Sequence, residues 1–171
     1  MSEQEDQLPN CIHCKFNDRG FPCRDAQGGL SIERLVESLL ICCQHEVETP
    51  EYEVNAWADE CARVLVEEAP ETAFRVILAA LPHFKADLEI AQLAAGPLED
   101  LVTQHGERMI DEIEREALSN ERFRYLLSGI WGQAHVPPKV WHRIQSAVEP
   151  GPLLDDDPRT PHGTNKGRDT R

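Results

Sequence analysis

The fold class follows from residues 31–43, which read SIERLVESLLICC. On a helix drawn through this stretch, Glu33 and Glu37 fall on one face and the apolar residues on the other. The apolar set is Ile32, Leu35, Val36, Leu39, Leu40 and Cys43. Ser31 stands where a side chain caps the first turn, so we predict an amphipathic helix from there to about His45.

Helical signals of the same kind continue to Glu149, and no stretch reads as a pair of strands. Start signals stand at Thr49-Pro50, Pro70, Gly96-Pro97, Asn120 and Pro137-Pro138. His105-Gly106 reads as a helix end, because glycine readily adopts the left-handed cap conformation. We therefore predict an all-α fold of about eight helices, either an antiparallel bundle or a short solenoid of helical hairpins.

The chain is expected to have three parts. Residues 1–29 form a non-helical, Cys-rich segment, residues 30–148 a helical domain, and residues 149–171 a disordered tail, because the tail's composition buries too little apolar surface to offset its ordering entropy. Side chains on the apolar stripes of the helices are expected in the core. They include Val54, Trp57, Leu88, Trp131 and Trp141.

Charge is unevenly distributed along the 171 residues, which carry 17 Lys and Arg against 31 Asp and Glu, a formal net charge of −14. Residues 30–68 hold ten of the acids and two of the bases, a net of −8. Such a surface repels phosphate, so we expect no nucleic acid as a partner and favour a protein, most simply a basic one.

No apolar run approaches the ~20 residues that span a bilayer, so no membrane partner is expected. The acidic start, Met1 to Asp6, lacks the basic and apolar parts of a secretory signal. The expected location is therefore the cytoplasm, where thiols stay reduced.

Three of the six cysteines, Cys11, Cys14 and Cys23, cluster near the N-terminus. In a reducing compartment such a cluster indicates a metal rather than a disulfide framework. The spacing of Cys11 and Cys14 lets two thiolates grip one tetrahedral ion from a tight turn, and Cys23 offers a third thiolate across a loop. We predict that a structural Zn²⁺ holds this segment, which has few apolar groups of its own.

The fourth ligand is open at this level. The candidates are His13, Asp25, Cys42, Cys43 and His45. The first helix rises ~16 Å between Ser31 and Cys42, and the link from Cys23 to Ser31 spans at most ~27 Å. The N-terminal segment can therefore run back along the helix, and we favour Cys42 or His45, since Cys43 fits the apolar stripe.

Sequence signatures of catalysis are missing from the chain. It has no His-Glu-x-x-His pattern, glycine-rich phosphate loop or nucleophile elbow. Glu99, Asp100 and His105 share one predicted helix, but Glu99 and His105 lie on different sides of it. We interpret them as helix start and stop residues rather than as a catalytic group.

Residues 94–144 contain a distinctive pattern. Its parts are Ala95-Gly96-Pro97-Leu98-Glu99-Asp100-Leu101, His105-Gly106, Phe123-Arg124 and Ile130-Trp131. This pattern resembles an uncharacterised family of small bacterial helical domains of unknown function. The resemblance implies a helical fold and a bacterial origin, and it brings no activity or site residue with it.

Two functions are expected from these observations. The first is a non-enzymatic acidic protein-interaction module with a structural zinc knuckle, as in an immunity or antitoxin-like protein. The alternative is a metal-dependent enzyme or thiol-based redox sensor, in which the N-terminal cysteine cluster keeps an open coordination position.

Overall fold

The computed structural model describes residues 22–149 and 151–154. Within that part the chain is helical and forms no strand, apart from one isolated bridge between Arg24 and Leu30. The helices are α1 (Ile32–Gln44), α2 (Pro50–Asn55), α3 (Trp57–Glu68), α4 (Pro70–Ala80), α5 (Asp87–Leu93), α6 (Glu99–Ser119), α7 (Glu121–Leu127) and α8 (Pro138–Val148). Two short turns, η3 (Ala94–Leu98, π-helical) and η4 (Gly132–Ala134, 3-10), complete the set. The predicted all-α class is confirmed.

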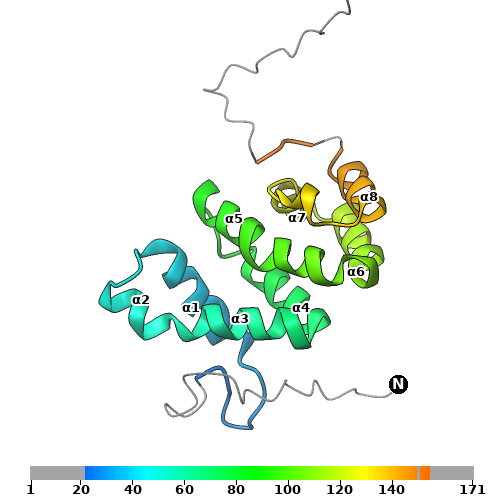
Figure 1. Ribbon diagram of the computed structural model, residues 1–171. Coiled ribbons are helices and arrows are strands. Elements are labelled where there is room, and N and C mark those ends of the chain that lie inside the picture. Colours follow the sequence, from blue (N-terminus) through cyan, green and yellow to red (C-terminus); the bar gives the residue numbers. More distant parts are fainter. Residues whose placement is uncertain (1–21, 150, 155–171) are drawn as a thin grey trace, which may run out of the picture.

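Two helices organise the packing. Helix α1 contacts α2, α3, α4 and α5, while α6 contacts α3, α4, α7 and α8. Figure 1 shows α5 and α6 as consecutive segments joined through η3, with α7 and α8 gathered at the far end of α6. Because these contacts link helices that are not neighbours in the chain, the architecture is an irregular bundle around one continuous core. None of the described helices is both long and apolar enough to cross a bilayer.

Local capping signals predicted from the sequence are confirmed at three helix starts. The side chains of Ser31, Thr49 and Asn120 accept hydrogen bonds from backbone amides in the first turns of α1, α2 and α7. These bonds satisfy amides that have no partner within the helix.

The expected division into about eight helices is not confirmed, because two helix boundaries in the structure differ from those predicted. The helix predicted from Thr49 breaks at Ala56 into α2 and α3. The stop predicted at His105-Gly106 is wrong, since α6 runs unbroken from Glu99 to Ser119. A methyl group at Gly106 would lie 2.9 Å from Val140 Cγ1, so the glycine lets α8 approach α6 and is not a cap.

Three residues expected in the core lie on the surface. The side chains of Val54, Leu88 and Trp131 are exposed, Trp131 to 73%. The backbone amide of Trp131 donates to Glu99 Oε2 at 2.8 Å, which fixes the chain after α7 while the indole faces solvent. Trp57 is buried as expected.

The contact between Gly106 and Val140 predicts an unusual pair of stability changes. In a Val140→Ala background, Gly106→Ala should stabilise the protein by about 1 kcal/mol, because alanine is the better helix former. In the wild-type background the same change should destabilise it, since overpacking costs about 1–3 kcal/mol. Urea denaturation of the four proteins of this cycle measures both effects. Equal effects of Gly106→Ala in the two backgrounds would contradict the close approach.

Candidate functional site

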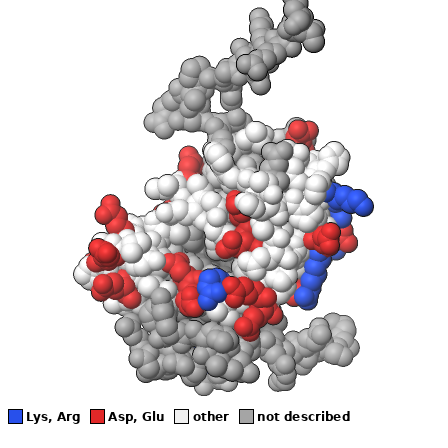
Figure 2. Space-filling view, viewed as in Figure 1, with Lys and Arg blue, Asp and Glu red and all other residues white. Residues whose placement is uncertain are grey.

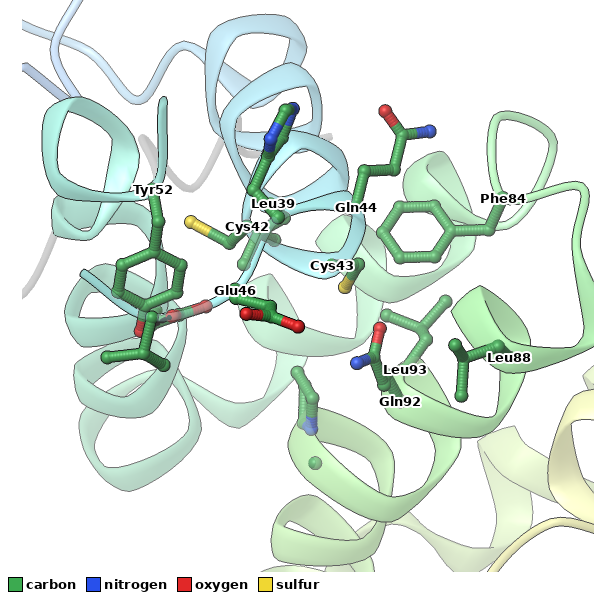
Figure 3. Close-up of a pocket in the computed structure, with 15 residues that line it drawn as sticks. Leu39, Cys42, Cys43, Gln44, Glu46, Tyr52, Phe84, Leu88, Gln92 and Leu93 are labelled. Carbon is green, nitrogen blue, oxygen red and sulfur yellow. Dashed lines mark hydrogen bonds between the residues drawn. The ribbon is translucent and has the colours of Figure 1, made fainter. Parts of the chain in front are cut away.

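A pocket of about 600 Å³ lies at the C-terminal end of α1. Its walls come from α1, from the loop that leads from α1 into α2, and from α3, α5 and η3. Apolar side chains line its base, namely Leu39, Phe84, Leu93 and Pro97. In Figure 3 Leu39 and Cys43 come from α1, and Leu88, Gln92 and Leu93 come from α5. Its volume is in the range that holds a small ligand or a few side chains of a partner.

The turn η3 creates one wall of this pocket. Gly96 has φ −104° and ψ −106°, which is not helical, and Pro97 lies inside the turn without an amide hydrogen to donate. The chain therefore changes direction between α5 and α6, and both Gly96 and Pro97 line the pocket. Insertions of this type are frequent at functional positions of helical proteins.

The opposite side of the mouth is the loop between α1 and α2. Thr49 fastens this loop, since its amide and hydroxyl both donate to the carbonyl of Glu46, at 3.2 and 2.8 Å. Glu48 adopts a positive φ of 78°, a conformation that a side chain of this kind rarely takes. The loop presents Val47 to solvent, 68% exposed, and Leu88 on α5 is exposed to the same extent. Both residues line the pocket, so its opening carries unpartnered apolar groups.

Carboxylates surround this apolar base. Glu46 and Asp59 line the pocket, and among its described lining residues none is Lys or Arg. The Tyr52 hydroxyl donates to Asp59 Oδ2 at 2.8 Å, which ties α2 to α3 across the break at Ala56. This bond to Asp59, with burial as a smaller cause, raises the pKa of Tyr52 to about 12. The tyrosine therefore remains a neutral hydrogen-bond donor at neutral pH.

Two adjacent thiols, Cys42 and Cys43, enter the pocket from the last turns of α1. In Figure 3 Cys42 points toward the side of Tyr52 and Cys43 toward α5. Burial, and then the negative charge of Asp59, raises the pKa of Cys42 to about 12 and that of Cys43 to about 11. The thiolate is the nucleophile and the metal ligand, so these neutral thiols are poorly suited to either role.

A second hollow, of about 220 Å³, shares Leu39, Asp59, Gly96 and Pro97 with the first. It continues along α3 toward Arg63 and Asp100. Arg63 is held by Glu60 and Glu67, at 2.7 and 2.5 Å, so its charge is compensated. Burial, and then repulsion by Glu99 and Glu67, raises the pKa of Asp100. We call the two hollows together the α1–η3 groove.

Acidic side chains outnumber basic ones around the α1–η3 groove. Figure 2 shows acidic side chains at the left edge of the molecule, over α2, and along the lower edge, over α3. Lys and Arg gather at the right edge, over α6 and α8. The negative excess predicted for residues 30–68 thus lies beside the groove, where it raises the local concentration of cations.

The predicted metal ligands do not meet within the described residues. Cys11 and Cys14 lie outside them. Cys23 is buried, 2% exposed, next to the start of α1, and the amide of Ser31 donates to its carbonyl at 2.9 Å. Cys42 and His45 lie at the other end of α1, a helix rise of ~16 Å away.

The link between Cys23 and α1 explains this separation. Within this link, the amide of Asp25 donates to the carbonyl of Gly29 at 2.8 Å, and Gly28 takes a positive φ of 85°. The link therefore closes as a tight turn and does not run back along α1. The guanidinium of Arg34 holds the turn by donating to the carbonyls of Pro22 and Arg24. Cys42 and His45 are thus not brought to Cys23. Residues 22–149 and 151–154 contain no group of three or more His, Cys, Asp or Glu placed to hold a metal.

Of the other polar candidates, Glu99 and Asp100 lie at the helix start predicted for them, and His105 does not lie at a helix end. Glu99 and Asp100 form the first turn of α6, and Glu99 anchors the backbone at Trp131. His105 lies within α6. The spacing of Tyr52, Asp59 and Val47 in the sequence does not mark them as site residues, because the groove depends on helices that come together only in the folded chain.

The raised pKa values of Cys42 and Cys43 predict slow alkylation. At pH 8 both thiols should react with iodoacetamide roughly 100- to 1,000-fold more slowly than a thiol of ordinary pKa, and the rates should rise about tenfold per pH unit up to pH 11. Peptide mapping by mass spectrometry after timed labelling measures each rate. The same protein in denaturant supplies the control, since all six cysteines should then react. Rapid labelling of Cys42 or Cys43 in the folded protein at pH 8 would contradict the raised pKa values.

Comparison with known proteins places the chain in a family. Neither the curated proteins nor the solved structures gave a match. A family model described as "Family of unknown function (DUF6869)" matches residues 45–150, which include most of the groove's lining and extend well beyond residues 94–144. The resemblance to an uncharacterised domain family is confirmed. The chain belongs to this family of unknown function.

Proposed function

We propose that this protein is a non-enzymatic interaction module that binds a basic segment of another protein in the α1–η3 groove. The observation that carries the proposal is that the groove has an apolar base and acidic side chains around that base. A bound segment would place apolar side chains against Leu39 and Leu93, and its Lys or Arg residues beside Glu46 and Asp59. Charge complementarity would steer the encounter, and the apolar contacts would supply most of the affinity.

The chemistry of the groove supports binding rather than catalysis. Its two thiols are held neutral, and its one tyrosine is committed to Asp59. A catalytic site needs a nucleophile or base with a pKa near the working pH, whereas the pKa values of these groups are raised away from it. The exposed Val47 and Leu88 at the mouth instead resemble the apolar contacts that protein partners bury.

An amphipathic probe peptide tests this proposal without a known partner. A synthetic helix of about 15 Leu and Lys residues should bind with a Kd on the order of 10–100 µM, and should bind more weakly as salt rises from about 0.05 to about 0.5 M. Val47→Ser and Leu88→Ser should each weaken binding about 3- to 10-fold, because each removes an exposed apolar contact. Isothermal titration calorimetry gives these values.

Two variants outside the groove serve as matched controls. Leu118→Ser changes a leucine on α6 that is more exposed than Val47 and Leu88, and Glu112→Lys matches Glu46→Lys in charge. Neither control should alter the Kd, whereas Glu46→Lys should weaken binding. Binding that responds equally to groove and control variants would mean nonspecific adhesion to an acidic protein. Binding of a small apolar dye in preference to the peptide would favour a small-molecule site.

We also propose a structural Zn²⁺ at Cys11, Cys14 and Cys23, with the fourth ligand supplied by a residue other than Cys42 or His45. Support comes from Cys23, whose buried position and backbone bond to Ser31 would give the metal one fixed attachment to the helical body. When bound, the ion would supply folding energy to the segment before α1.

Elemental analysis of the native protein should find about one zinc per chain, because structural sites bind this ion tightly. The paired variant Cys11→Ser/Cys14→Ser should lose it while keeping the helical circular dichroism of the domain. Cys42→Ser is the matched control and should retain the metal. Native protein without metal would remove the zinc proposal, and an ion with a bound water would favour the alternative of a metal-dependent enzyme or redox sensor.

A further inference from the structure

Residues 158–171 reverse the charge of the rest of the chain. They read PRTPHGTNKGRDTR and hold three Arg and one Lys against one Asp, a net of +3 in a protein whose formal net charge is −14. Their only hydrophobic side chains are those of proline. The segment thus offers the cationic half of the ligand chemistry that the α1–η3 groove would attract, without the apolar half.

The chain that leads into this segment is fastened next to the groove. The amide of Leu154 donates to Ser128 Oγ at 2.9 Å, and its side chain fills the space over Gly129. A methyl group at Gly129 would overlap Leu154 Cδ2 and would lie 3.0 Å from Ala94 Cβ. Leu154 and Ala94 therefore pack at the same point, and Ala94 begins η3, the turn whose Gly96 and Pro97 line the groove.

The chain after Leu154 is long enough for its basic residues to reach the groove. Twelve residues separate Leu154 from Lys166, and they can span at most ~40 Å. A flexible chain of that length has a typical end-to-end distance of ~20 Å. Tethering of this kind gives an effective concentration in the millimolar range, so even a weak charge contact would be substantially occupied.

We propose that residues 158–171 occupy the acidic α1–η3 groove of their own chain and compete there with the partner segment. This inference rests on the proposed function, since it assigns to the groove a second, internal ligand. Glu46, Asp59 and Asp100 receive the basic side chains, and the apolar base formed by Leu39 and Leu93 remains uncovered. A partner that carries both Lys or Arg and apolar anchors therefore displaces the internal segment.

Zero-length cross-linking with a carbodiimide tests the contact directly. In the full-length monomer, Lys166 should couple to Glu46, Asp59 or Asp100, with a yield that is independent of protein concentration and falls about tenfold in high salt. Lys139 on α8 is the comparison lysine and should not couple to these three carboxylates. Coupling of Lys166 mainly to acids on the far part of α6, such as Glu112, would overturn the proposal, and so would no coupling at all.

Competition gives a second measurement on intact protein. The full-length variant Arg159→Gln/Lys166→Gln/Arg168→Gln/Arg171→Gln should bind the Leu–Lys probe peptide about 3- to 10-fold more tightly than wild type, because the internal competitor has lost its charge. The control is Lys139→Gln, which should leave the Kd unchanged. An unchanged Kd in the fourfold variant refutes the internal ligand alone. If neither protein binds the probe, the proposed function itself fails.

Discussion

At η3 the chain leaves α5 and enters α6 in a new direction, because Gly96 departs from helical geometry and Pro97 cannot donate a backbone hydrogen bond. This bend lets α5 lie against α1 while α6 packs on α3, α4 and α8. Gly96 and Pro97 also line both hollows of the α1–η3 groove, so the same turn shapes the bundle and the groove.

Local chemistry predicted much of the fold. Ser31, Thr49 and Asn120 cap helices as expected, because a capping side chain acts within its own turn. Gly106 was misread because the same residue serves as a cap or as a close-packing point, and only the position of Val140 on a distant helix decides between them. Trp131 was misread because an apolar residue at helical spacing is buried only if another element covers it.

The groove was not predictable from spacing for a related reason. Tyr52 and Asp59 lie on consecutive helices separated by a turn at Ala56, and their spacing in the sequence did not indicate that the tyrosine hydroxyl donates to the carboxylate. Their partners across the pocket come from α5 and η3, about 40 residues later in the chain. What the sequence did indicate was the charge of this face, because net charge needs no knowledge of packing.

The loop between α1 and α2 has a consequence for the rate and cost of binding. Its shape is already set by the bonds of Thr49 to Glu46 and by the left-handed conformation of Glu48. The conformational entropy of this loop is therefore lost when the protein folds, and a ligand need not order it again. Because the loop at the pocket opening is already ordered, a ligand can dock without a prior rearrangement of the loop. The association rate should therefore be limited by diffusional encounter rather than by loop closure.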